Sequence, residues 1–127
     1  MSAETTKRPA RQAGPELIVL QRFEELTGWL LQHTGRWPKS ARFTLAQRVQ
    51  NHALDIVEML VEARYEPRVR RERLHAANLR LERLRFLCRI AKHAGVMPQR
   101  GFESAMRGLD ETGRMLYGWR QSLETGA

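Results

Sequence analysis

Apolar residues recur at helical spacing in four segments of the chain, about residues 16–34, 41–65, 68–94 and 98–123. In the second and third segments these residues are three or four positions apart, which is the pattern of a heptad core seam. Turn-forming residues separate the segments, namely Gly35, Pro38, Pro67, Gly95 and Pro98. Alternating apolar and polar runs, which mark strands, are nearly absent. The pattern predicts an all-α fold, an up-down-up-down antiparallel four-helix bundle formed by residues 15–124.

The same spacing predicts which residues face the core. In the first segment they are Leu17, Val19, Leu20, Phe23, Leu26, Leu30 and Leu31, and in the second Leu45, Val49, Ala53, Ile56, Leu60 and Ala63. In the third they are Leu74, Ala77, Leu81, Leu84, Cys88 and Ala91, and in the fourth Phe102, Met106, Leu109, Gly113, Leu116 and Leu123. A glycine inside a helix costs about 1 kcal/mol relative to alanine. A close approach of a neighbouring helix is therefore expected at Gly108, Gly113 and Gly118.

Charge is unevenly distributed along the chain. The 127 residues include 22 Lys and Arg against 14 Asp and Glu, a formal net charge of +8, and 19 of the 22 are arginines. Residues 64–107 alone hold 12 basic and 4 acidic residues, and those four acids cannot neutralise the cations around them. Arginine suits phosphates and carboxylates because its planar guanidinium binds both in a bidentate manner. A nucleic acid or an acidic protein is therefore the predicted partner.

Composition also narrows the expected cellular location of the protein. The single cysteine, Cys88, excludes an intramolecular disulfide and a multi-cysteine zinc site, so a reducing cytoplasm is the expected location. No stretch approaches the roughly 18 apolar residues that span a bilayer, and we expect no membrane partner. Residues 1–14 carry basic residues without the apolar core of a signal peptide, and they are predicted to form a disordered tail.

The third segment has a second apolar face. When its core seam is placed on a heptad, Leu79, Phe86 and Ile90 fall on one line roughly opposite the seam. Isolated exposed apolar residues are ordinary on protein surfaces. Three of them stacked along one helix favour a subunit interface. We call these three residues the apolar stripe.

Basic residues follow one flank of the same helix, at Arg71, Arg85, Arg89 and Lys92. Such a line of cations is typical of a surface that contacts a phosphate backbone. Two alternatives stay open, which are pairing with an acidic protein surface and plain solvation. A structural bundle that docks an acidic protein partner, without binding nucleic acid, is accordingly the second candidate function.

The connection between the first two segments adds three cations. These are Arg36, Lys39 and Arg42, and they surround Trp37, which is expected to be exposed there. Cations interleaved with an exposed aromatic residue also suit nucleic acid. Like the other two tryptophans, Trp37 can serve in the core, in an interface or in base stacking, and packing is the default interpretation for large aromatic residues.

Patterns for catalysis and metal binding are weak. The sequence contains no Gly-rich phosphate loop, no Gly-x-Ser-x-Gly and no His-Glu-x-x-His. Glu72 and His75 have the Glu-x-x-His spacing of di-iron bundles, but such a site needs two of these motifs facing the core, and these residues fall outside the seam. Cys88 lies in the seam and is expected to pack as a small core residue. No enzymatic activity, metal or cofactor is predicted.

Three stretches of the sequence resemble a known family. They are Trp37-Pro38-Lys39-Ser40-x-Arg42-Phe43-Thr44-Leu45, Leu81-x-x-Leu84-Arg85-Phe86-Leu87-x-Arg89 and Gly113-Arg114-Met115-Leu116-Tyr117-Gly118-Trp119. Their order and spacing within residues 17–123 are similar to those of the accessory variability determinant (Avd) proteins of diversity-generating retroelements, within the wider four-helix-bundle protein family. Relatives encoded in ribosomal RNA intervening sequences carry an Ile-Pro-x-Asn-Ile-Ala-Glu-Gly-like segment, which this chain lacks.

The resemblance implies a cytoplasmic, non-catalytic accessory subunit that assembles as a ring-like homopentamer. Such a subunit binds RNA or DNA by contacts with the nucleic-acid backbone. It joins the reverse transcriptase of the same retroelement in the mutagenic cDNA synthesis of retrohoming. The implied nucleic-acid contacts fall on Arg71, Arg85, Arg89 and Lys92. The resemblance also implies that the apolar stripe is a contact between protomers.

Overall fold

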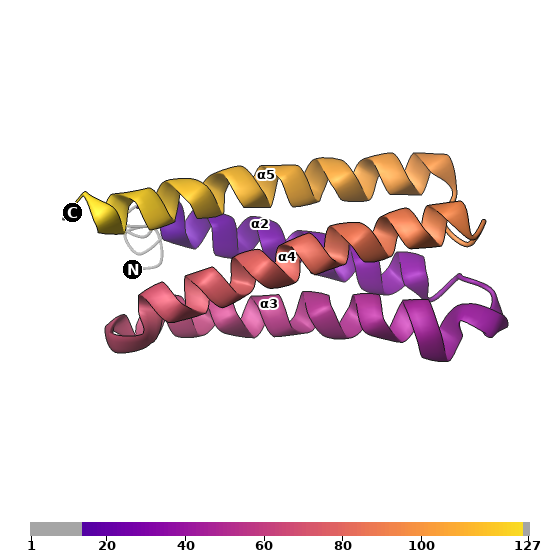
Figure 1. The fold of residues 1–127 in the computed structure, drawn as a ribbon, viewed down its shortest axis with the longest axis horizontal. Helices are drawn as coiled ribbons and strands as arrows, with labels where there is room; N and C mark the ends of the chain where they lie inside the picture. Colours follow the sequence, from indigo (N-terminus) through magenta and orange to yellow (C-terminus); the bar gives the residue numbers. More distant parts are fainter. Residues whose placement is uncertain (1–13, 126–127) are drawn as a thin grey trace, which may run out of the picture.

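Four long helices make up the protein in the computed structural model, which describes residues 14–125 (Figure 1). They are α2 (Gly14–Thr34), α3 (Gln47–Tyr65), α4 (Arg70–His93) and α5 (Gln99–Glu124). Short helical turns lie in two of the connections, namely the 3₁₀ turn η1 (Lys39–Ala41), the π-helical turn η2 (Arg42–Ala46) and the 3₁₀ turn η3 (Pro67–Val69). No strand occurs within these residues, and the prediction of an all-helical bundle is confirmed.

Successive helices run antiparallel along one common axis (Figure 1). Helix α3 packs against α2 and α4, and α5 packs against the same two helices. The connections 35–46 and 94–98 therefore lie together at one end of the bundle. The α3–α4 connection lies at the other end, with the start of α2 and the end of α5.

The core seams of α3 and α4 are the predicted ones. All six residues predicted for α4 are buried, from Leu74 to Ala91. The residues predicted for α3 are fully buried from Val49 to Ala63. Cys88 lies among the buried residues of α4, and burial raises the pKa of its thiol to about 11. A thiol that stays protonated in an apolar site is an inert packing group.

The seam of α5 differs from the prediction. Its buried residues are Ala105, Leu109, Thr112, Leu116 and Trp119. The predicted Phe102, Met106, Gly113 and Leu123 are only half-buried. The apolar pattern is misleading here because two seam positions hold a small and a polar residue. Thr112 is accommodated because its hydroxyl donates to the carbonyl of Gly108 at 2.9 Å.

Threonines also take seam positions in α2. Its buried residues are Val19, Phe23, Thr27, Leu30 and Thr34. Leu31, predicted to face the core, is exposed because the seam passes through Thr27 and Thr34 instead. The hydroxyl of Thr34 donates to the carbonyl of Leu30 at 2.8 Å and accepts from the amide of Gln50 at 2.9 Å. The bond from Gln50 joins the start of α3 to the end of α2.

Two of the three glycines predicted to allow close approach do so. A Cβ on Gly108 would lie 2.8 Å from Cδ1 of Leu26 in α2. A Cβ on Gly113 would lie 2.9 Å from Nη2 of Arg85 in α4. Nothing lies within 4 Å of the Cβ position at Gly118, so the predicted close approach is wrong there.

The connections shape the helix ends. The sequence pattern predicts one helix from about residue 41, whereas the chain passes through η1 and η2 before α3 begins at Gln47. Ala41 has φ −100° and ψ 0°, which interrupts the helical path between the two turns. Gly95, one of the turn-forming residues of the sequence, follows α4 with a φ of +74°, the left-handed conformation typical of a glycine that ends a helix.

The predicted disordered tail falls almost entirely beyond the described part of the chain. Residues 1–13 lie outside the described residues, and Gly14 begins α2. None of the helices between residues 14 and 125 combines the length and the apolarity that crossing a bilayer needs.

Candidate nucleic-acid interface

The cations predicted to bind nucleic acid fall into two groups. Arg71 and Arg85 are held by carboxylates of α5. The second group comprises Arg36, Lys39, Arg42, Arg89 and Lys92. These five side chains are exposed, and they form no ion pair within residues 14–125.

Arg85 connects α4 to α5. Its side chain is 19% exposed, and its guanidinium nitrogens lie 2.7 Å from Oε2 of Glu82 and 3.1 Å from Oδ1 of Asp110. The same guanidinium donates to the carbonyl of Leu109 at 3.3 Å. Two carboxylates and a carbonyl therefore occupy the donors that a phosphate would need. In this arrangement Arg85 stabilises the bundle.

Acids from α3 and α5 neutralise further arginines of α4. The pairs are Arg71–Glu124, Arg73–Glu62 and Arg80–Asp55. Exposed pairs of this kind contribute about 0–1 kcal/mol each to stability, but each one cancels a positive charge. The segment is nevertheless not left unneutralised, because acids from outside residues 64–107 pair with these three arginines.

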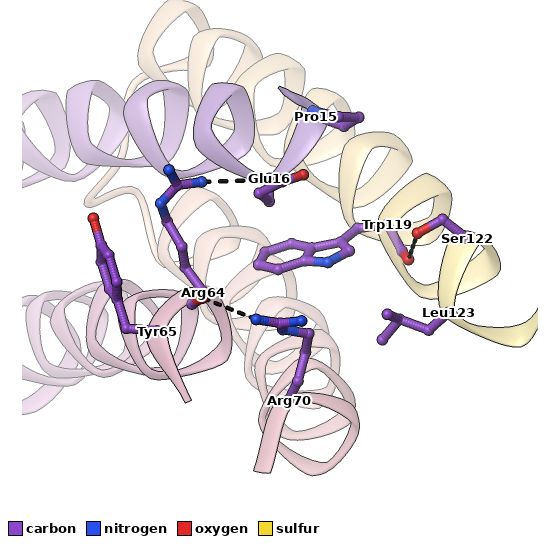
Figure 2. A pocket seen from close by; sticks show the side chains of 8 residues that line it. All are labelled: Pro15, Glu16, Arg64, Tyr65, Arg70, Trp119, Ser122 and Leu123. Atoms are coloured by element: carbon purple, nitrogen blue, oxygen red, sulfur yellow. Dashed lines mark hydrogen bonds and ion pairs between the residues drawn. The ribbon is translucent and has the colours of Figure 1, made fainter. Parts of the chain in front are cut away.

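The end of the bundle that holds the α3–α4 connection carries both signs of charge. A cavity of about 450 Å³ lies there. Figure 2 shows the side chains that line it, which are Pro15, Glu16, Arg64, Tyr65, Arg70, Trp119, Ser122 and Leu123. Arg70 donates to the carbonyl of Arg64 at 2.9 Å and to that of Ala63. Arg64 is directed toward Glu16, with 3.9 Å between Nη1 and Oε2 (Figure 2). The guanidinium groups of Arg64 and Arg70 thus meet acceptors within the protein.

Exposed cations gather at the opposite end, where the connections 35–46 and 94–98 lie (Figure 1). We define the basic end as Arg36, Lys39, Arg42, Arg48, Arg89, Lys92, Arg100 and Arg107. All eight are exposed, and Glu103 is the only acidic residue within 33–50 and 89–107. The remaining described residues hold 11 basic and 12 acidic side chains. The positive charge of the described protein is therefore concentrated at the basic end.

Packing between helices fixes the position of the basic end. Nζ of Lys92 lies 4.8 Å from the ring centre of Phe102, which joins the end of α4 to the start of α5. A Cβ on Gly101 would lie 2.5 Å from Cε1 of His33, so α5 begins directly against the end of α2. The cations at this end therefore stand on a rigid support formed by several helices.

Sequence patterns alone do not find three members of the basic end. Arg48 and Arg100 lie in the first turns of α3 and α5, and Arg107 lies about two turns into α5. All three are away from the flank of α4 and the connection before α3. The signal that identifies them is the antiparallel topology. It brings the start of α3 to the end of α2, and the start of α5 to the end of α4.

Trp37 is not the exposed aromatic residue expected in the connection. Its side chain is 8% exposed and lies edge-on to His33, with 6.0 Å between ring centres. His33 in turn stacks on Trp29 at 4.7 Å. Burial lowers the pKa of His33, and the nearby Arg36 guanidinium adds to that shift. Packing, the default interpretation, is the observed role of Trp37 and also of Trp119, which is 5% exposed.

The apolar stripe lies on the surface, on the side of α4 away from its seam. Leu79, Phe86 and Ile90 are 47%, 58% and 50% exposed. The guanidinium carbon of Arg89 lies 5.0 Å from the ring centre of Phe86, so the stripe reaches the basic end. A groove of about 370 Å³ borders it, lined by Arg48, His52, Leu79, Glu82, Arg83, Phe86 and Leu87.

The Glu-x-x-His pair lies on the outside of α4. Glu72 and His75 are both exposed, as their positions outside the seam predict. Nδ1 of His75 lies 3.4 Å from Nη2 of Arg120. A metal site would need a carboxylate beside the histidine, whereas Arg120 is a cation. Within the described part of the chain, no group of three or more His, Cys, Asp or Glu side chains is placed to hold a metal ion.

A known protein family matches most of the chain. The family model described as bAvd-like matches residues 17–123. No curated protein matches the chain. The matched range contains nearly all of the four helices, and it includes every residue of the basic end and of the apolar stripe.

Proposed function

The chain belongs to the bAvd-like family, and on that premise we propose that it is a non-catalytic accessory subunit of a diversity-generating retroelement. In this role it binds RNA or DNA through the basic end and associates with the reverse transcriptase of the same element. Together they carry out the mutagenic cDNA synthesis of retrohoming in the cytoplasm. A non-catalytic accessory subunit acts by binding, and the exposed cations of the basic end provide a binding surface.

One observation supports the nucleic-acid part of the proposal. Eight exposed cations at one end of the bundle are accompanied by a single acidic residue. The backbone of a nucleic acid presents a phosphate every few ångströms, and binding releases the counterions condensed on it. The basic end matches this ligand because its charge is dense, exposed and not cancelled by carboxylates of the described residues.

Phosphate contacts of this kind have a defined consequence for specificity. Guanidinium and ammonium groups bind phosphate oxygens by charge and by hydrogen bonds, and these contacts carry no information about the base sequence. The protein is therefore expected to bind unrelated sequences with similar affinity. The concentrated charge also attracts a polyanion over a distance, which raises the association rate at low salt.

The apolar stripe supports self-assembly as part of the same proposal. Its three exposed side chains form a line along α4 that a second copy can cover. A closed ring, the homopentamer that the family resemblance implies, repeats the basic end around its axis. Repeated cationic ends would bind one nucleic-acid strand at several points, which raises the overall affinity.

A triple substitution in the connection tests the basic end. Arg36→Ala, Lys39→Ala and Arg42→Ala together remove three cations that make no ion pair within the described residues, so the fold is expected to be unchanged. Affinity for a labelled RNA, measured by fluorescence anisotropy at low salt, is expected to fall about tenfold or more. The loss is expected to be the same for unrelated sequences.

A matched variant controls for net charge. Arg68→Ala, Arg71→Ala and Arg120→Ala remove the same charge from the other end of the bundle, and this variant is expected to bind RNA nearly as well as the parent. An equal loss in both triple variants would show that net charge drives binding, and the basic end would lose its role. A parent protein that binds neither RNA nor DNA but retains an acidic protein would favour the scaffolding alternative.

A further inference from the structure

One exposed aromatic side chain at the basic end has no packing role. Phe43 lies in the π-helical turn η2 and is 78% exposed, more than any other large apolar side chain among the described residues. The turn and the residue before it pack against the bundle through Ala41 and Ala46, which are buried, and Leu45, which is half-buried. Phe43 stands two residues from Ala41 and two from Leu45, about half a turn from each. Its ring therefore points away from the bundle.

Cations surround Phe43 along the chain. Arg42 precedes it directly, Lys39 stands about one turn before it and Arg48 about one turn after it. All three are exposed and make no ion pair within residues 14–125. An exposed ring among unneutralised cations is the composition of a surface that binds single-stranded nucleic acid.

The Phe43 ring is largely uncovered. Two other exposed aromatic residues are partly covered: the guanidinium carbon of Arg89 lies 5.0 Å from the ring centre of Phe86, and that of Arg64 lies 5.4 Å from the ring centre of Tyr65. Within the described residues, neither a cation nor an aromatic ring stacks on Phe43. The π-helical turn that presents it is a rare local structure, and such turns are frequent at functional sites.

Building on the proposed function, we infer that Phe43 is a base-stacking residue and that the basic end binds single-stranded nucleic acid in preference to duplex. An unpaired base can stack on the open ring while Lys39 and Arg42 hold the phosphates on either side. In a duplex the bases stack on one another and offer no face to the protein. Stacking is sequence-tolerant, since every base has a π face, so this preference is for strandedness and not for sequence.

Binding by Phe43 variants of the full chain tests the inference. The probes are a single-stranded RNA and a single-stranded DNA of about 20 nucleotides, and the same RNA annealed to its complement. The parent is expected to bind both single strands more tightly than the duplex. Phe43→Ala is expected to lose about fivefold to about a hundredfold in affinity for the single strands, the range measured for one stacked base, and to change little with the duplex.

Three further variants separate stacking from other effects. Phe43→Trp keeps an aromatic face and is expected to retain single-strand binding. Phe43→Leu keeps an apolar side chain without a ring and is expected to behave like Phe43→Ala. Tyr65→Ala removes a ring that is 65% exposed at the other end of the bundle, and it is expected to leave binding unchanged. The mass of each variant is measured by light scattering.

The outcomes distinguish this inference from the proposed function. A lower mass for Phe43→Ala would make Phe43 a subunit contact and overturn the inference. Full binding by Phe43→Leu, or an equal loss on single strand and duplex, would do the same. If the parent binds both forms equally and Phe43→Ala is unaffected, stacking fails while the basic end stands. If the parent binds neither form, both proposals fail.

Discussion

The role of an arginine in this protein depends on what faces it. Arg85 and Arg89 lie about one turn apart on α4, yet Arg85 is held by Glu82 and Asp110, whereas Arg89 is exposed beside the ring of Phe86. The difference comes from α5, which brings Asp110 to Arg85. A prediction made from one helix at a time groups the two residues together, because the acid that separates them is distant in sequence.

Two glycines of α5 are expected to respond differently to substitution by alanine. Gly118→Ala adds a methyl group where nothing lies within 4 Å, so it is expected to stabilise the helix by up to about 1 kcal/mol. Gly108→Ala places its Cβ 2.8 Å from Cδ1 of Leu26, and the gain is offset by the displacement of that side chain. The free energy of unfolding in urea, with an unchanged m-value, measures both. Equal stabilisation by the two variants would contradict the close approach at Gly108.

Individual helices differ in how far their sequence predicts their packing. The seam of α4 is predicted completely because every core position holds an apolar residue, from Leu74 to Ala91. The seam of α5 is not, because Thr112 occupies a core position while Met106 and Phe102 lie at its edge. Hydrophobicity identifies a seam only where the seam is wholly apolar. A buried threonine that bonds to its own helix leaves no such signal.

The two apolar faces of α4 predict opposite responses to a charge. Leu84 is fully buried, so Leu84→Asp is expected to lower the free energy of unfolding by about 3–5 kcal/mol or more, since it loses apolar burial and buries a carboxylate. Phe86 is 58% exposed, so Phe86→Asp is expected to leave helicity nearly intact while the assembly loses mass. Circular dichroism and light scattering measure the two effects. A folded Phe86→Asp variant of unchanged mass would remove the stripe from the interface.

The whole molecule is polarised along its long axis. In the sequence the excess charge belongs to residues 64–107, but the fold neutralises several of those arginines with acids from α3 and α5. It also brings cations from the α2–α3 connection and from the N-terminal parts of α3 and α5 to the end of α4. The basic end is therefore a product of topology. Its members come from separate segments, so no single stretch of sequence defines it.

The salt dependence of RNA binding tests the central claim most directly. Between about 50 and about 200 mM monovalent salt, each neutralised phosphate of a single strand contributes about −0.7 to the slope of log K against log salt. The parent is expected to show a steep negative slope. Alanine at Arg36, Lys39 and Arg42 is expected to make that slope shallower by about 2, and the matched variant at the other end is expected to leave it unchanged. A slope near zero, or one equal in the parent and the first variant, would contradict binding of the phosphate backbone by the basic end.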